Sequence, residues 1–450
     1  MVSVGQHENI EILSYSEVEE VSGFVGNFKA RVRKKARYVN SDLCTGCGLC
    51  MEKCPTKKIP SEFEAGMGVR TAIYIPFAQA VPRVPVIDRE NCRYFQTGKC
   101  GVCAKFCPRE AVDYEQEDET VELEVGTILV ATGFDLFDCS RTTQYGYGRY
   151  DNVLDSMQFE RLVHASGPTG GRIVLKDGRE PEAVAILHCI GSRDDNYNRY
   201  CSRVCCMYSL KLAHLVKDAT DAQVYEFYID MRAFGKGYEE FYERLQKEAV
   251  IFIRGKAAEV VPYNGRLLVK AEDANLGRVV QVPVDMVVMS AGLEPRQDAS
   301  GVAQTFGLSR SADGFFLEKH PKLAPVETAS DGVFIAGACQ GPKDIPDTVA
   351  QAGAAAVAAL AMMDRGKVTL EPSIAQVDTE RCSGCGECVI ACPYSAIELV
   401  EGHAQVDETA CKGCGTCVGH CLPKALTLLH FTDEELVAEM QGALRLLEVA

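Results

Sequence analysis

The chain has 450 residues, of which 47% are apolar and 22 are cysteine, with no tryptophan. This length corresponds to roughly three domains, and the apolar content is sufficient for large cores, which excludes intrinsic disorder and fibrous architectures. The 63 acidic and 47 basic residues give a formal net charge of −16 at pH 7, the wrong sign for a protein that binds a phosphate backbone. We therefore expect no nucleic-acid partner.

The N-terminal stretch MVSVGQHENIEIL has neither the basic region nor the apolar core of a secretory signal. The alanine-rich stretch 350–363 is too short to predict a bilayer span. We expect a cytoplasmic protein with no membrane span. In a reducing compartment, so many free thiols indicate metal binding or redox catalysis rather than packing or disulfides.

Two cysteine runs come first along the chain. The first has the spacing C-x2-C-x2-C-x3-C, by which bacterial ferredoxins hold [4Fe–4S] clusters, because three thiolates in one tight loop can each reach a different iron. The second has the same order, with seven residues instead of two after its first cysteine. The two runs are Cys44, Cys47, Cys50, Cys54 and Cys92, Cys100, Cys103, Cys107. The fourth cysteine of each run binds the other cluster in two-cluster ferredoxins, so Cys107 should complete the first site and Cys54 the second.

Strands and helices alternate in the central part of the chain. Apolar strands are predicted at 121–134, 183–192, 224–230, 284–292 and 331–341, and helices at 238–249 and 346–366. This alternation predicts a doubly wound α/β domain with parallel strands. The strand at 183 runs into CIGSRD without a G-x-G-x-x-G loop, so NAD(P) binding is not expected there, and Asp230 is interpreted as a solvated strand end.

A fifth cysteine group lies within this central part. Its members are Cys189, Cys201, Cys205 and Cys206. Apolar residues at helical spacing place Cys205 and Cys206 in the first turn of a helix, where thiolates are favoured. From the residues alone, metal ligation and simple burial of small apolar side chains are equally good interpretations.

Two further ferredoxin runs follow near the C-terminus, both with the uninterrupted spacing. They are Cys382, Cys385, Cys388, Cys392 and Cys411, Cys414, Cys417, Cys421. Here Cys421 should complete the first site and Cys392 the second. Four-thiolate zinc sites usually have longer loops between C-x2-C pairs, so zinc is disfavoured. The tail after Thr432, a predicted N-cap, has apolar residues at Leu436, Met440, Leu444 and Leu447, and we expect this helix to pack on its own domain rather than to dock a partner.

Two short motifs resemble flavin-contacting elements of the pyridine-nucleotide-disulfide oxidoreductases. They are I-L-V-A-T-G at 128–133 and G-V-F-I-A-G at 332–337, followed by a helix. The resemblance implies FAD contacts by Thr132, Gly133, Gly337, Ala338, Asp347, Thr348, Val349 and Ala350. A helix that starts near residues 347–349 would point free amides and its positive end at the flavin. An ordinary packed strand and helix is the alternative.

The whole pattern, over residues 8–438, closely resembles the heterodisulfide reductase A-subunit family. The stretches that carry the resemblance include YCSRVCCMY, AFGKGYEEFY and GACQGPKDIPDTVAQA. The family implies a fifth [4Fe–4S] cluster on the Cys189 group beside an FAD, with the flavin converting two-electron to one-electron transfer in electron bifurcation. It also implies that Lys211 lies near the flavin N5, for which the alternative is a solvent-facing helix lysine. The implied partners are ferredoxin, other heterodisulfide-reductase-like subunits, and a hydrogenase- or dehydrogenase-type donor subunit, in a hetero-oligomer of anaerobic metabolism.

The resemblance also divides the chain into domains. It implies a remnant of the flavin domain at 1–37, an inserted two-cluster ferredoxin at 38–113, and an incomplete flavin-type α/β domain at 114–366 with a nested NAD-like subdomain at about 172–292. A C-terminal two-cluster ferredoxin at 372–430 and a helix at 431–450 follow. No G-x-G-x-x-G occurs in the first 40 residues, so we expect a split subunit or a truncated reading frame.

Two other functions are weighed against this one. A polyferredoxin-like wiring subunit without bound flavin is the alternative, and an NAD(P)H-dependent flavoprotein of the glutamate-synthase small-subunit type is disfavoured because the nucleotide loop is absent. Cys139 and Cys339 remain outside the five groups as packing residues, with a flavin neighbour as the second interpretation for Cys339.

Overall fold

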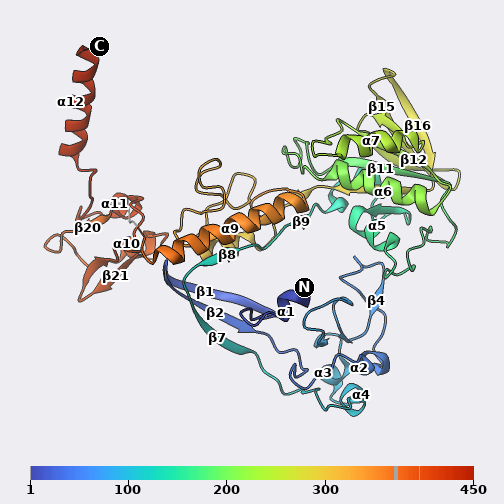
Figure 1. Ribbon diagram of the computed structural model, residues 1–450, viewed down its shortest axis with the longest axis horizontal. Helices are drawn as coiled ribbons and strands as arrows, with labels where there is room; N and C mark the ends of the chain where they lie inside the picture. The colour runs from blue at the N-terminus through green and yellow to red at the C-terminus, as the bar shows by residue number, and fades with distance from the viewer. Residues whose placement is uncertain (1, 369–372, 395, 450) are drawn as a thin grey trace.

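The computed structural model describes residues 2–368, 373–394 and 396–449. Figure 1 shows three cysteine-bearing regions at separate corners: the inserted segment in blue, the nested subdomain in green and the C-terminal ferredoxin in red. The long helix α9 (Ile345–Arg365) runs between the last two regions. The predicted boundary at residue 372 lies outside the described residues.

A long antiparallel sheet near the N-terminus carries the inserted segment. Its strands, in the order β1-β2-β7, are β1 (Ser16–Phe24), β2 (Asn27–Lys34) and β7 (Glu119–Val125), and a short helix α1 (Val2–Gly5) precedes them. The β2–β7 pairing ends at Lys34↔Glu119, so the chain leaves the sheet after Lys34 and re-enters at Glu119. A bridge between Val39 and Val112 closes the neck of the insertion.

The central body is built on a two-stranded parallel sheet of β8 (Ile128–Val130) and β19 (Val333–Ile335). The prediction of one strand over 121–134 is wrong, because the chain breaks at Gly126 and Thr127 and changes partner from β2 to β19. Helix α8 (Ala299–Phe306), the pair β9 (Asp135–Leu136) and β18 (Leu293–Glu294), and the short helices η1 (Cys139–Arg141), η2 (Thr143–Tyr145) and η3 (Gly337–Cys339) complete this region.

The nested subdomain has a five-stranded parallel sheet in the order β10-β17-β11-β12-β13. The strands are β10 (Val153–Asp155), β11 (Ala183–Ile190), β12 (Gln223–Tyr228), β13 (Ile251–Arg254) and β17 (Met286–Ala291). All eight residues of β11 are buried, as expected for a strand covered on both faces. Helices α5 (Ser156–Val163), α6 (Cys205–Ala219) and α7 (Tyr238–Lys247) accompany the sheet, and an antiparallel meander of β14 (Ala257–Tyr263), β15 (Arg266–Asp273) and β16 (Arg278–Val284) is inserted before β17.

Both ferredoxin regions consist of short elements. The inserted one has α2 (Leu49–Lys53), β3 (Ile59–Pro60), β4 (Val69–Arg70), β5 (Ile73–Tyr74), β6 (Val86–Ile87), α3 (Arg93–Thr97) and α4 (Val102–Lys105). The C-terminal one has β20 (Ala375–Val377), α10 (Glu387–Ala391), β21 (Ile397–Val400), β22 (His403–Val406), α11 (Thr416–His420) and β23 (Leu426–Leu428), and α12 (Asp433–Val449) follows. Cysteines form part of both cores.

Helix α9 is the one helix of the described residues that is long and apolar enough to cross a membrane, judged by length and composition alone. It extends beyond the predicted stretch 350–363 at both ends. Ala355 and Ala359 pack on the body, whereas Val349, Val357 and Leu360 are more than half exposed. A broad apolar face of α9 is therefore open to solvent.

A buried ion pair joins the insertion to the nested subdomain. Arg161 on α5 donates two hydrogen bonds to Glu64, from Nε at 3.0 Å and from Nη2 at 3.1 Å, and both side chains are largely buried. The Arg161 guanidinium also lies 4.5 Å from the centroid of the Phe63 ring. The longer linker between the first two cysteine runs therefore packs on helix α5 of the nested subdomain and is not a free loop.

We expect Glu64→Ala to destabilise the protein by about 3 kcal/mol, because it leaves the Arg161 charge buried without a partner. Thermal unfolding followed by circular dichroism measures this loss. Asp177→Ala is the matched control, since the Asp177–Arg179 pair is exposed and contributes little. Equal melting temperatures for the two variants would contradict a stabilising role of the Glu64–Arg161 pair.

Candidate metal centres

Three cavities of similar size are each lined by four cysteines. Their volumes are about 370, 310 and 350 Å³. The first is lined by Cys44, Cys47, Cys50 and Cys107, the second by Cys54, Cys92, Cys100 and Cys103, and the third by Cys382, Cys385, Cys388 and Cys421. In each cavity, the structure brings together three cysteines of one run and the fourth cysteine of the other, which is the grouping predicted from the spacing.

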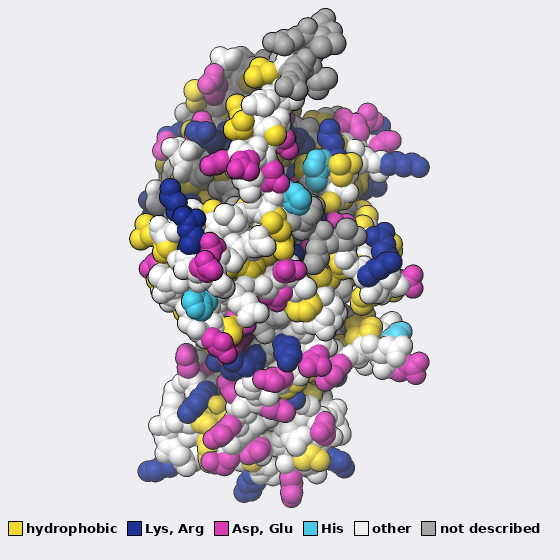
Figure 2. Space-filling view, turned by 90° about the vertical axis from the view of Figure 1, so that its left-hand side faces the viewer, with side chains coloured by type: hydrophobic (Ala, Val, Ile, Leu, Met, Phe, Trp, Pro, Cys, Tyr) yellow, Lys and Arg dark blue, Asp and Glu magenta, His cyan; other side chains and the backbone are white. Residues whose placement is uncertain are grey.

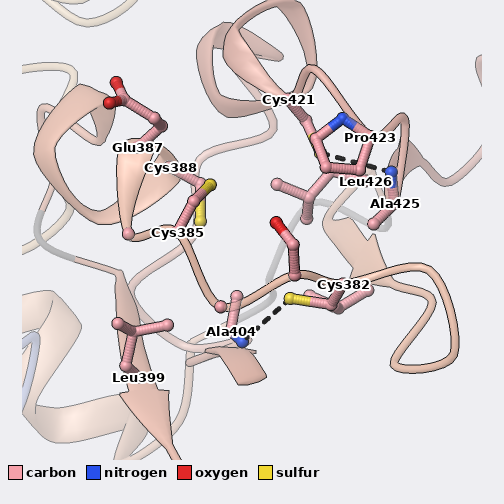
Figure 3. A pocket seen from close by; sticks show the side chains of 14 residues that line it. Cys382, Cys385, Glu387, Cys388, Leu399, Ala404, Cys421, Pro423, Ala425 and Leu426 are labelled. Atoms are coloured by element: carbon pink, nitrogen blue, oxygen red, sulfur yellow. Dashed lines mark hydrogen bonds between the residues drawn. The ribbon is translucent and has the colours of Figure 1, made fainter. Parts of the chain in front are cut away.

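Figure 3 shows the third cavity, with Cys421 reaching it from a different segment than Cys382, Cys385 and Cys388. The remaining ferredoxin cysteines also lie near one another. Burial raises the pKa of Cys417 to about 11, with further contributions from Cys392, Cys411 and Cys414. These four are the predicted members of the fourth site.

Glycines inside three of the cysteine loops have a steric reason to be there. Gly46, Gly384 and Gly413 all have positive φ, between 61° and 67°. A Cβ on Gly384 would lie 2.2 Å from the carbonyl oxygen of Gly402, and one on Gly413 would lie 2.0 Å from that of Ser373. Only glycine allows the loop to turn this closely against the neighbouring backbone.

Backbone amides donate hydrogen bonds to the fourth cysteine of three runs, the cysteine that is predicted to complete the site of the other run. The amide of Ala111 donates to Cys107 at 3.3 Å, that of Ala396 to Cys392 at 3.3 Å, and that of Ala425 to Cys421 at 3.2 Å. Each donor lies four residues after its cysteine, a C-x3-A spacing that is a usable sequence signal. Such bonds stabilise thiolate charge and tune cluster potentials.

Tyr114 is a neighbour of the second site that the sequence analysis missed. Its hydroxyl oxygen lies 2.9 Å from the Cys103 sulfur, and its ring stacks on Tyr94 with centroids 3.7 Å apart. Burial raises the pKa of Tyr114, and the contact with Cys103 raises it further. The hydroxyl is therefore a neutral hydrogen-bonding group at this cavity.

The fifth cysteine group is placed by a strand end, a loop and a helix start. Cys189 lies near the end of β11 with φ of +57°, where the β11–β17 register shifts between Leu187 and Ile190. Such a bulge redirects a side chain. Cys205 and Cys206 begin α6 as predicted, and no side-chain hydrogen bond caps this helix.

The four thiols of this group influence one another. Burial raises the pKa of Cys189 to about 11, and Cys206 and Cys201 contribute to the shift. Cys189, Cys205 and Cys206 are each about 5% exposed, whereas Cys201 lines an open depression of about 970 Å³ beside Arg203 and Phe234. The group therefore has a buried side and a solvent-facing side.

Asp230 lies just after β12 with its side chain 44% exposed, as predicted, and it also forms two ion pairs. Its carboxylate accepts hydrogen bonds from Arg193 at 2.7 Å and from Arg254 at 3.3 Å, so it fixes the loop that follows Cys189. Both ion pairs lower the pKa of Asp230, with Arg193 the main cause. An acidic group held in this way is not free to bind a ribose.

The predicted flavin residues lie at two neighbouring glycine turns. Gly133 follows β8 and Gly337 follows β19, with φ of +80° and +81°. A Cβ on Gly337 would lie 3.3 Å from Cγ2 of Thr348, so the turn approaches α9 closely. The buried Cys339 lies between the turns, with its thiol 3.5 Å from the Val130 carbonyl oxygen. The carboxyl ends of adjacent parallel strands are where such sheets bind ligands, so these residues fit a cofactor.

The start of α9 differs from the prediction. Asp344 is the N-cap, the helix begins at Ile345, and the Asp347 amide donates to the Asp344 side chain at 2.8 Å. The Thr348 amide donates to the Asp344 carbonyl at 2.9 Å, so these two amides are not free. Val349 and Ala350 follow within the first turns of the helix.

Two polar side chains that are predicted to lie at the flavin, Asp347 and Lys211, form ion pairs with other residues. The Asp347 carboxylate accepts from Arg203 at 2.8 Å. Lys211 is half-exposed on α6 and donates to both oxygens of Glu160, at 2.7 and 2.8 Å. Its role at a flavin remains a prediction.

The spacing of the described side chains does not suit a single metal ion. Among the described residues, no three His, Cys, Asp or Glu side chains converge closely enough to bind one metal ion. Tetrahedral zinc needs four sulfurs about 2.3 Å from a common centre. In an iron–sulfur cube each thiolate binds a different iron, which requires wider spacing.

Comparison with known proteins agrees with this chemistry. Residues 374–422 match the 4Fe-4S dicluster domain family, and residues 37–57 match the 4Fe-4S binding domain family. The A subunit of the H(2):CoB-CoM heterodisulfide,ferredoxin reductase of Methanothermobacter thermautotrophicus is 49% identical over 99% of this chain and 67% of its own length. The iron-sulfur A subunit of the CoB--CoM heterodisulfide reductase of Methanocaldococcus jannaschii is 48% identical over 99% of this chain and 68% of its own length.

The chain belongs to the heterodisulfide reductase A-subunit family. It spans about two thirds of the length of these relatives. Among solved structures, the thioredoxin reductase of T. acidophilum is similar with a TM-score of 0.36 and 14% identity, over 66% of this chain and 86% of that chain. The predicted α/β fold with ferredoxin regions is confirmed, and the chain is an iron–sulfur oxidoreductase subunit of the heterodisulfide reductase type.

The crossed grouping of cysteines can be tested by combining variants. We expect Cys54→Ser and Cys92→Ser each to lower the iron content by about four per chain, and the double variant to lower it by the same four, because both cysteines serve one cube. Anaerobic reconstitution with iron and sulfide analysis measures this. Cys139→Ser is the control that loses no iron, and a double variant that loses about eight irons would contradict the assignment of Cys54 and Cys92 to one site.

Proposed function

We propose that this chain, in its complex, binds FAD at the Gly133 and Gly337 turns and distributes electrons from it to the cysteine-held clusters, as the electron-bifurcating subunit of a heterodisulfide-reductase-like enzyme. The observation that carries the proposal is the position of the two turns. The turns follow β8 and β19 and precede α9, and Figure 1 shows β8 and α9 between three cysteine-bearing regions that occupy separate corners of the molecule. FAD supplies two-electron chemistry when bound, and iron–sulfur clusters accept single electrons.

The residues around the turns are suited to hold an electron-rich ring. Lys343 donates from Nζ to the Gly337 carbonyl at 2.9 Å and to Gln340 Oε1 at 2.8 Å. Burial lowers its pKa, which shows that the ammonium group is partly removed from water. The Gln351 side chain accepts from the Gly337 amide at 2.8 Å and so fixes the turn. The positive end of α9 lies at the same place.

The partners we propose are ferredoxin, other subunits of such a complex, and a hydrogenase- or dehydrogenase-type donor, in the cytoplasm of an anaerobe. Two relatives are named for reduction of CoB-CoM heterodisulfide and ferredoxin. On the face in Figure 2, acidic and basic side chains are interspersed with apolar ones.

The prediction that the C-terminal helix α12 packs on its own domain is wrong. Leu436, Met440 and Leu444 are exposed, and Leu447 lies among the residues whose side chains are not described.

One observation favours the alternative of a wiring subunit without flavin. The Asp347 and Thr348 amides, which were expected to face the flavin, are already bonded to Asp344. Such a protein would hold the same clusters but carry only single electrons between partners. Flavin content distinguishes the two functions.

We expect Gly337→Ala to reduce the flavin content of the assembled complex, because a side chain there is strained at positive φ and crowds Thr348. The iron content should stay at about 20 per chain. Fluorescence after acid release measures flavin, and Gly353→Ala on α9, where a Cβ meets no neighbour, is the matched control. Complex that holds its full iron and no flavin without any substitution would support the wiring function instead.

A further inference from the structure

A buried histidine–glutamate pair lies beneath the fifth cysteine group. His188 Nε2 is 2.8 Å from Glu226 Oε2, and the two side chains are 1% and 0% exposed. They project from neighbouring strands β11 and β12 into an aliphatic core that includes Ile186 and Val224. A pair of ionisable groups in such a core is costly unless each polar atom has a partner, so its presence needs a reason.

The pair faces the first turn of α6. Residues of β11 alternate between two cores, and Val184 and Ile186 pack with α6 residues such as Leu210 and Ala213. His188, two residues after Ile186, continues that row and lies beside Cys206. Its Nδ1 has no hydrogen-bond partner among the described residues. The ring therefore has one nitrogen held by Glu226 and one nitrogen free on the side of the cysteine group.

The local electrostatics agree with this geometry. Burial opposes charge on His188, but Glu226 and Cys206 together outweigh it and the pKa of His188 is raised. Burial also works to raise the pKa of Cys206, but His188 and the backbone of Arg232 together outweigh it and the pKa is lowered. Of the three buried cysteines in the group, Cys206 is the one whose thiolate form is favoured.

We propose that His188 is a positioning residue that donates a hydrogen bond from Nδ1 to the Cys206 sulfur when this group holds its cluster, with Glu226 fixing the ring. The inference rests on the proposed function and on a fifth [4Fe–4S] cluster held by Cys189, Cys201, Cys205 and Cys206, which the family resemblance implies and which we include in that proposal. With one proton shared between Nε2 and Glu226 and a second on Nδ1 the pair is neutral overall, whereas loss of the Nδ1 proton would leave a net negative charge buried beside the cysteine thiolates, which is costly. A donor to a ligand sulfur stabilises the more negative, reduced state, so His188 raises the reduction potential of this cluster above that of the same site without the bond.

The test uses the full chain reconstituted anaerobically, with each cluster followed by electron paramagnetic resonance during a redox titration. His188→Gln retains a donor toward Glu226 but loses the Nδ1 position. We expect the fifth cluster to titrate at a more negative potential, with roughly tenfold faster loss of its iron to a chelator, and the other four clusters to be unchanged. His214→Gln is the matched control, because His214 on the nearby helix α6 also pairs with a glutamate, Glu248 at 2.9 Å.

A second variant covers failure of the first to fold. His188→Asn combined with Glu226→Gln places an amide donor near the Nδ1 position, and we expect it to titrate close to the unsubstituted protein. A fifth cluster whose potential and iron release are the same in His188→Gln as in the control would overturn the role of His188 alone. Unsubstituted protein with about 16 irons and four reducible clusters would overturn the fifth cluster and this role together.

Discussion

The structure depends on the requirement that four thiolates from distant parts of the chain surround one cavity. Each ferredoxin site takes three cysteines from one loop and the fourth from a run at least 18 residues away, so every cluster ties two segments together. The loops can turn this tightly only because Gly46, Gly384 and Gly413 have positive φ against neighbouring backbone. Metal binding in such sites is coupled to folding, since the unfolded chain has no preformed site. The apolar cores around the cysteines are small and include the cysteines themselves, so we expect cluster binding to contribute much of the stability of these regions.

The nested subdomain shows how a nucleotide fold can accommodate a cluster. In a doubly wound sheet the end of the first strand and the start of the next helix hold pyrophosphate on glycine amides. Here a bulge at the end of β11 redirects Cys189 to that place, and Cys205 and Cys206 occupy the helix start. Asp230, at the position of a ribose contact, is held by two arginines instead. The topology is retained, while the side chains at its binding point are suited to iron rather than phosphate.

The sequence predicted the parts of the site whose spacing is local. Cysteine intervals, the start of α6 and the buried strand β11 all follow from patterns within about 20 residues, and the structure has them as expected. The break between β7 and β8 was missed because valine or leucine recurs on both sides of Gly126 and Thr127, and only the different partners of the two strands distinguish them. His188, Glu226 and Tyr114 were missed because their roles arise from neighbours on other strands or loops, which no periodicity in the chain encodes.

The exposed apolar faces of α9 and α12 differ in what the rest of each helix packs on. Helix α12 follows the C-terminal ferredoxin region and begins with a capping box. The side chains of Thr432 and Glu435 each accept a hydrogen bond from the other's backbone amide, at 3.4 and 3.1 Å. The capping box fixes where that helix begins, and its described apolar side chains are exposed. Helix α9 instead has Ala355 and Ala359 against a sheet of only two parallel strands, and parallel sheets are normally covered and several strands wide. The open face of α9 therefore belongs to a body whose parallel sheet has two strands, whereas that of α12 projects from a region that has its own core.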